Sequence, residues 1–284
     1  DHPVLVSLTL QPGGRTLLGT EVATALATLL PLRPAAFGLN CSAGPHELAP
    51  HIRALARLSP IPVSVMPNAG LPELIGDRAT FPMTPQDFAE GLVPLVVEHG
   101  VRIVGGCCGT TPQHIAALVS GLAKRPPAVR KPSARAVTAM LTSLYETVPL
   151  RRPVRPLRIG ERASASGSRA FRQRLLVDDL DGAAALARTQ EADGAHAIDL
   201  CVAAAGRDEA RDMVAIADRL NRVSRLPLCI DTTRHEVMEA ALQHVTGRAV
   251  LNSLTLEDPD RARRILALAR DYGAAVVALA IDEE

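Results

Sequence analysis

Apolar residues along this chain fall in short runs that alternate with longer amphipathic stretches. In the first half, four runs read as buried strands: residues 4–10, 35–40, 61–68 and 101–106. Between them lie helical patterns such as residues 19–30 and 84–100, the second opening on Thr84 and Pro85 and closing on Gly100. Apolar strands that alternate with helices predict a parallel sheet covered by helices.

The same alternation returns in the second half of the chain. Five further runs read as strands: residues 157–162, 195–202, 226–233, 248–255 and 274–284. The stretch between the two arrays is rich in proline and arginine and predicts a connector, with a short helix expected over residues 134–146. The predicted organisation is therefore a first domain over 1–123, a linker over 124–156 and a second domain over 157–284.

The predicted strands end in polar or reactive residues. In a (β/α)8 barrel the carboxyl ends of the strands carry the chemistry, which this pattern fits. A barrel of this type closes with eight strands, whereas the two arrays have four and five. We therefore expect an α/β fold of two TIM-type barrels, each only partly represented: the C-terminal half of one and the N-terminal part of another, in a fragment of a longer polypeptide.

Composition excludes several classes of partner. The net charge is +1 and aromatic residues make up 2% of the chain, so the arginine-rich linker predicts a solvated segment and no nucleic-acid partner. No apolar run is long enough to span a bilayer. The five cysteines lack the spacing of a disulfide framework, which predicts reduced thiols in a cytoplasmic protein.

Three of those cysteines follow predicted strands. Cys41 ends one strand, and Cys107 and Cys108 end another, between glycines that free the local backbone. On one rim of a parallel barrel the three sulfur atoms converge, and three thiolates suit a tetrahedral Zn²⁺ with one open position. Two alternatives stay open: a strained disulfide between Cys107 and Cys108, or small buried side chains.

The stretches "GLNCSAGP" and "GGCCGTTPQHI", with "GRTLLGT" before them, resemble the homocysteine S-methyltransferase family over the first 120 residues or so. The resemblance implies that Cys41, Cys107 and Cys108 bind zinc, and that zinc activates the homocysteine thiol for methylation. Asn68 and Gly106 lie on the same rim, which places them in the vicinity of homocysteine. Asn68 contacts zinc or substrate in this interpretation; capping of its own turn is the alternative.

The second array carries "IGERASASGSRAF", "AIDL", "CIDTT", "VLNSLT" and "YGAAVVALAIDE". These stretches resemble the pterin-binding barrel that follows in the cobalamin-dependent methionine synthase family. The resemblance implies that 5-methyltetrahydrofolate supplies the methyl group, and that cobalamin on a module outside this chain relays it to homocysteine. It assigns pterin recognition to residues at strand ends: Asp199, Asp231, Asn252 and, near the end of the chain, Asp282. For any one acidic residue alone, a helix cap is the simpler interpretation.

Three positions depart from the pterin-binding pattern. The usual GERTN reads "GERAS" here, with Ala163 and Ser164, and Cys201 follows "AIDL" where asparagine is typical. Each change is expected to remove an amide or hydroxyl near the pterin. Besides the folate-dependent enzyme, two alternatives remain: a zinc-dependent thiol methyltransferase that uses another donor beside a degenerate pterin barrel, and a zinc-stabilised scaffold without catalysis.

Overall fold

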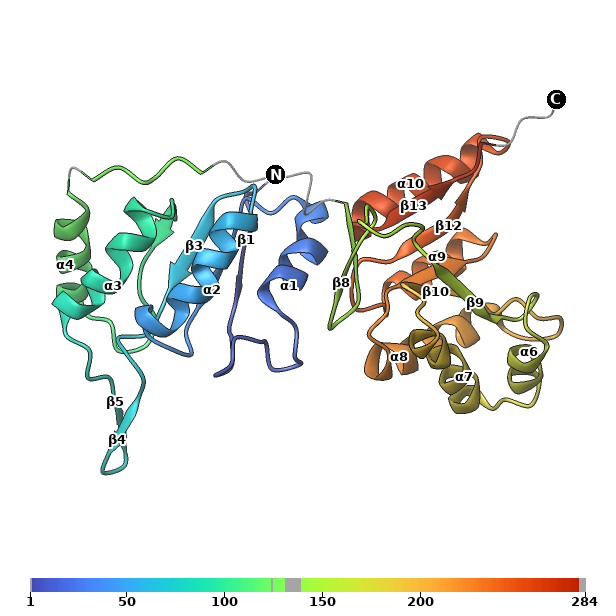
Figure 1. The fold of residues 1–284 in the computed structure, drawn as a ribbon, viewed down its shortest axis with the longest axis horizontal. Helices are drawn as coiled ribbons and strands as arrows, with labels where there is room; N and C mark the ends of the chain where they lie inside the picture. The colour runs from blue at the N-terminus through green and yellow to red at the C-terminus, as the bar shows by residue number, and fades with distance from the viewer. Residues whose placement is uncertain (1, 124, 131–138, 281–284) are drawn as a thin grey trace. The chain divides into compact units, whose positions relative to one another are not determined.

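The computed structural model describes residues 2–123, 125–130 and 139–280. They group into two compact units (Figure 1). Of the described residues, the first unit contains 2–26, 33–123 and 125–130. The second unit contains 27–32 and 139–280. Among the described residues, no helix combines the length and the apolar character that crossing a membrane requires.

The first half of the chain builds a four-stranded parallel sheet in the order β1-β2-β3-β6. Each strand therefore lies beside the strand that precedes it in the sequence, as in a (β/α)8 barrel and unlike a doubly wound sheet, where the order reverses. The strands are β1 (Leu5–Leu8), β2 (Ala36–Asn40), β3 (Val63–Met66) and β6 (Ile103–Val104). The helices are α1 (Val22–Leu29), the 3-10 turn η1 (Leu30–Leu32), α2 (Pro45–Leu58), α3 (Pro85–Val97) and α4 (Pro112–Leu122).

Helix α3 begins and ends where its sequence predicts. The Thr84 hydroxyl accepts a hydrogen bond from the Asp87 backbone N–H at 3.2 Å, and Pro85 occupies the first helical position. After the helix, Gly100 takes a φ of +67°, a left-handed conformation that glycine adopts without a steric penalty. Local signals thus mark both ends of this helix.

The second unit contains a five-stranded parallel sheet in the order β13-β12-β11-β10-β9, again sequential. The strands are β9 (Ile159–Ser164), β10 (Ala197–Cys201), β11 (Leu228–Asp231), β12 (Val250–Leu254) and β13 (Ala275–Ala278). The helices are α6 (Arg169–Leu176), α7 (Leu180–Ala192), α8 (Glu209–Val223), α9 (His235–Leu242) and α10 (Pro259–Tyr272). The predicted class, α/β with parallel strands covered by helices, is confirmed in both halves.

The two faces of the second sheet have different partners. Ile198, Leu200 and Ile230 join the large core formed with the helices. On the opposite face, Cys229 and Val250 pack against a smaller cluster. Cys229 is 1% exposed, so it is a core residue, as its position within a strand predicts.

The smaller cluster is completed by a β-hairpin where the sequence predicted a helix. Strands β7 (Met140–Thr142) and β8 (Thr147–Pro149) pair antiparallel, and they bury Leu141 and Val148 against the sheet. The helix expected over 134–146 is therefore wrong for residues 140–146; residues 131–138 lie outside the described part of the chain. The Ser143 hydroxyl accepts the N–H groups of Tyr145 and Glu146 at 3.1 and 3.0 Å, which stabilises the turn in place of a helix.

The start of the proline- and arginine-rich stretch is anchored on the first unit. The Arg130 guanidinium donates to the carbonyl oxygens of Ala56, Ser59 and Ile61 at 3.0, 2.8 and 2.7 Å. These oxygens lie at and just beyond the end of α2, where helical carbonyls lack intrahelical partners. Arg130 thus acts as a cap for this helix.

Candidate functional site

The three cysteines that follow β2 and β6 lie together. The Sγ atom of Cys108 is 3.8 Å from that of Cys41 and 3.8 Å from that of Cys107. All three sulfur atoms lie within 4.8 Å of one another. The structure therefore brings together the thiols that the rule of convergent strand ends predicted to meet.

These separations test whether the cluster fits a metal ion. In a tetrahedral zinc site with Zn–S bonds of about 2.3 Å, two sulfur ligands lie about 3.8 Å apart. The two shorter separations equal this value, whereas a disulfide needs about 2.05 Å. All three cysteines are free thiols, and Cys108 is exposed. The set therefore suits a zinc ion with three protein ligands and a fourth position that a substrate can reach.

The cysteine loops are held in place by backbone hydrogen bonds to the segment that follows β3. The N–H of Cys41 donates to the Met66 carbonyl at 2.9 Å, and the N–H of Cys107 donates to the Pro67 carbonyl at 2.7 Å. Cys41 and Ser42 both have a φ of +62°. Two successive left-handed residues are uncommon outside glycine, so the chain turns sharply where the first thiol leaves the strand.

Gly106 precedes the cysteine pair, and the loop around the pair requires a residue without a side chain here. A Cβ atom at this position would lie 2.3 Å from the Thr110 side chain. The Thr110 hydroxyl in turn donates to the Cys107 carbonyl, which closes the loop around the pair. Gly106 therefore permits the tight loop; its place near homocysteine remains a prediction.

Asn68 lies between the cysteine loops. Its side chain is 4% exposed, and its Oδ1 accepts the Cys108 backbone N–H at 3.1 Å. Its own N–H donates to the Ala43 carbonyl at 2.9 Å, in the loop that follows Cys41. The side chain thus binds a loop 40 residues further along the chain. Asn68 connects the two segments that supply the thiols.

Hydrogen bonds shift the pKa values of two of the thiols in opposite directions. The pKa of Cys41 is lowered, chiefly because the Ser42 backbone N–H hydrogen-bonds its sulfur atom. The pKa of Cys108 is raised to about 11, chiefly by its hydrogen bonds with Cys41 and Cys107. Three adjacent thiolates repel one another, so full ionisation of the set needs a cation among them.

We expect Asn68→Ala to weaken zinc binding about 10- to 100-fold, the usual cost of losing a residue that orients a metal ligand. The Asn68 side chain hydrogen-bonds the Cys108 N–H, so its loss frees the loop that carries two of the thiols. Competition with a chromophoric chelator measures the effect. The control is Asn221→Ala, which removes a half-buried, hydrogen-bonded amide in the second unit. Equal affinity in both variants would contradict the orienting role.

His114 lies at the start of α4 and serves that helix. Its Nδ1 accepts the Thr111 N–H at 3.2 Å, and its Nε2 lies 3.0 Å from the Met83 carbonyl. The ring is buried and packs edge-on against Phe88. These contacts make His114 part of the cap at the start of α4.

A hairpin that the strand and helix alternation does not predict leaves the same rim. Strands β4 (Glu73–Ile75) and β5 (Arg78–Thr80) pair antiparallel and project from the first unit (Figure 1). Phe81 follows directly and packs so closely on Gly109 that a Cβ there would lie 2.3 Å from it. The two-residue turn Gly76-Asp77 between short strands was the available signal.

In the second unit, four polar side chains form a row across neighbouring strand ends. Ser164 pairs with Cys201, and Asp231 pairs with Asn252. Leu200 pairs with Ile230, so the residues that follow them, Cys201 and Asp231, lie side by side. Neighbouring residues in register point to the same face of a sheet, so this row shares one surface.

Asp199 lies on the same face, two residues before Cys201. Its side chain is 7% exposed and accepts a hydrogen bond from the Asn252 amide at 3.3 Å. Burial raises the pKa of both Asp199 and Asp231. The structure thus brings Asp199, Asp231 and Asn252 together, whereas Asp282 lies outside the described residues.

The three departures from the pterin-binding pattern differ in their consequences. Ala163 is fully buried in the core beneath the helices, so this change alters the core and removes no group from the polar face. The expectation that all three positions adjoin the pterin is therefore wrong for Ala163. Ser164 and Cys201 do lie in the polar row, and both are nearly buried.

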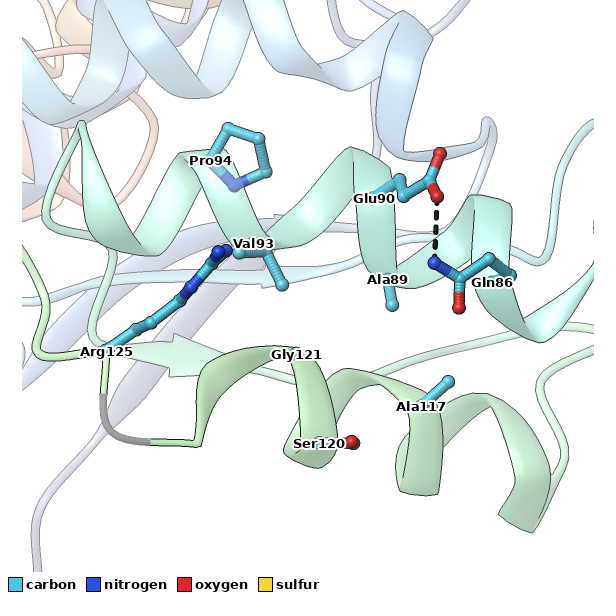
Figure 2. Close-up of a pocket in the computed structure, with 9 residues that line it drawn as sticks. All are labelled: Gln86, Ala89, Glu90, Val93, Pro94, Ala117, Ser120, Gly121 and Arg125. Atoms are coloured by element: carbon cyan, nitrogen blue, oxygen red, sulfur yellow. Dashed lines mark hydrogen bonds between the residues drawn. The ribbon is translucent and has the colours of Figure 1, made fainter.

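A groove of the first unit lies away from the thiols. It has a volume of about 470 Å³ and separates α3 from α4, with Ala89 and Val93 facing Ala117 and Gly121 (Figure 2). None of the cysteines lines it. It carries no cluster of titratable groups comparable to the thiols, so we do not assign the chemistry to it.

Two family models match the chain, one over each half. The family model described as homocysteine S-methyltransferase matches residues 1–122, and the model described as pterin binding enzyme matches residues 160–284. The chain is 42% identical over 287 residues to methionine synthase of Mycobacterium tuberculosis (strain ATCC 25618 / H37Rv). It is 42% identical over 288 residues to methionine synthase of Mycobacterium leprae (strain TN). Each alignment covers 99% of this chain and 24% of the relative, so the chain spans about a quarter of their length.

Proposed function

Because this chain is a homologue of methionine synthase, with homocysteine S-methyltransferase and pterin-binding domains, we propose that it takes part in methyl transfer to homocysteine. The methyl group comes from 5-methyltetrahydrofolate and is relayed by cobalamin. A cobalamin-binding module of the same polypeptide or of a partner carries that relay. The observation that supports the proposal most is the spacing of the three sulfur atoms, two pairs of which are 3.8 Å apart.

In the proposed reaction, Cys41, Cys107 and Cys108 hold zinc. When bound, the ion supplies Lewis-acid chemistry that lowers the pKa of the substrate thiol from about 8.5, so that it is nucleophilic at neutral pH. Asn68 holds the two cysteine loops together through its hydrogen bonds to both. The exposure of Cys108 leaves the thiol cluster open to the substrate. Because the ligands must be reduced thiols, the proposal places the protein in the cytoplasm.

The second unit supplies the pterin site of the proposed reaction. The Asp231 carboxylate accepts hydrogen bonds from N–H groups of the pterin ring, and the Asn252 amide both donates and accepts. Asp199 orients that amide, because its Oδ1 atom accepts a hydrogen bond from the amide nitrogen Nδ2 of Asn252 at 3.3 Å. Asp282 is a further candidate contact at the end of the chain.

The test of this function is methionine formation by the whole, zinc-loaded protein. We expect methionine from homocysteine and 5-methyltetrahydrofolate only when cobalamin is present. The bound zinc should number about one per chain, as expected for a three-thiolate site with one open position. Methionine formation from another donor without folate would favour a degenerate pterin barrel. Zinc binding without any product from homocysteine would instead favour a scaffold.

A further inference from the structure

One arginine of α10 binds the backbone at the ends of two neighbouring strands. The Arg261 Nε atom donates to the Thr233 carbonyl oxygen at 2.9 Å, in the loop that follows β11. Its Nη2 atom donates to the carbonyl oxygen of Ser253 in β12 at 3.2 Å and, more weakly, to that of Thr232 at 3.5 Å. The guanidinium is planar and holds its N–H groups in a fixed fork, so it sets the separation of the two segments that it binds.

The carbonyls that Arg261 binds lie just after residues of the proposed pterin site. Thr232 follows Asp231, and Ser253 follows Asn252. Asp231 and Asn252 are partners in register, and the Thr232 N–H also donates to the Asn252 carbonyl at 3.3 Å. Each of these side chains is attached to backbone that the guanidinium holds. A shift of either segment would therefore change the direction in which Asp231 or Asn252 points.

Arg261 differs in this respect from an ordinary surface arginine. It is half-buried, and no carboxylate of the described residues forms an ion pair with it. Arg263 of the same helix, in contrast, is exposed and pairs with Asp260. On the side of α8, the Thr232 hydroxyl donates to Glu209 Oε1 at 2.5 Å. Both helices thus hold the loop after β11, and Arg261 also connects this loop to β12.

We infer that Arg261 is a positioning residue for the pterin site: its guanidinium binds the backbone beside Asp231 and Asn252 and fixes the two side chains relative to each other. The Nε and Nη2 atoms are directed at carbonyl oxygens, so Arg261 acts through these two residues and not by contact with the pterin. The inference rests on the proposed function, because it concerns how the second unit binds 5-methyltetrahydrofolate.

The test compares Arg261→Met with Arg261→Lys in the whole protein. Calorimetry measures the binding of 5-methyltetrahydrofolate. Methionine keeps an aliphatic stem but has no donor, so we expect binding about 10-fold weaker, the effect of about one hydrogen bond. Lysine keeps the charge and one set of donors without the planar fork, so we expect a smaller loss of about threefold. Arg263→Met is the matched control on the same helix, and its affinity should stay within about twofold of the parent.

A double-mutant cycle separates the positioning role from a merely structural one. If Arg261 acts through Asp231 and Asn252, Arg261→Met should cost about threefold in an Asn252→Ala background, because one of the two residues that it positions is gone. An equal factor in both backgrounds would mean that Arg261 only stabilises the unit, and would overturn the inference. Unchanged affinity in Arg261→Met would overturn it as well.

A second ligand excludes direct contact. We expect Arg261→Met to weaken the binding of 6-methyltetrahydropterin, which has the pterin ring without the aminobenzoyl-glutamate tail, by the same factor as that of 5-methyltetrahydrofolate. A loss confined to 5-methyltetrahydrofolate would mean that the guanidinium binds the tail, contrary to the inference. A parent protein that binds neither compound would instead overturn the proposed function.

Discussion

Replacing Cys108 with alanine is expected to abolish stoichiometric zinc binding and methyl transfer to homocysteine. Cys108 lies 3.8 Å from both other sulfur atoms, so its loss leaves two thiols. Two thiolates hold zinc far more weakly than three. We expect the affinity to fall by more than about 100-fold, beyond the 10- to 100-fold cost of losing a residue that only orients a ligand. Metal analysis after dialysis and a methionine assay measure the two losses.

The control for this prediction is Cys201→Ala. It also removes a cysteine from a strand end, but in the second unit, so the zinc content should stay at the parent level. Circular dichroism should show that both variants keep their helices. Full zinc occupancy in Cys108→Ala after dialysis would mean that the three thiols are not the metal site, despite their spacing.

Pterin binding is expected to depend strongly on Asp231 and Asn252 together. The double variant Asp231→Ala, Asn252→Ala removes a carboxylate and an amide that face one surface in register. Hydrogen bonds to charged groups contribute about 1.5–3 kcal/mol each, so calorimetry should show 5-methyltetrahydrofolate binding weakened by more than about 100-fold. The zinc content of the first unit should not change.

Asp193→Ala is the matched control for the pterin prediction. Asp193 is an exposed carboxylate of the same unit, paired with Arg162 at 2.5 Å at the surface. Exposed ion pairs contribute little to stability, so this variant should bind pterin within about twofold of the parent. If both variants bound pterin equally well, the polar row would not be the pterin site.

The local sequence was sufficient for most elements of the two sheets. Thr84 and Gly100 mark the two ends of helix α3, because capping and a left-handed turn act within a few residues. Hairpin β7–β8 was mistaken for a helix, because its stability comes from distant partners. Arg248, more than 100 residues away, donates to the Met140 carbonyl at 2.9 Å, and Cys229 packs against the hairpin. Tertiary contacts of this kind override local propensity.

The candidate metal site likewise combines residues that the sequence predicts with a role that only the structure shows. Residue type and position at strand ends were enough to select Cys41, Cys107 and Cys108, because parallel strands deliver their carboxyl ends to one rim. The role of Asn68 was not accessible in this way. Its partner is a backbone N–H 40 residues away, and no sequence pattern reports which loop an amide faces.

By itself, the sequence determined the α/β alternation, the thiol set and the polar residues at the strand ends, because these follow from periodicity and residue chemistry within short windows. Only the tertiary structure decided which face each residue occupies. Ala163 and Ser164 are adjacent, yet one lies in the core under the helices and the other in the polar row with Cys201. Successive side chains in a strand point to opposite faces, and the register between strands selects the face that becomes the site.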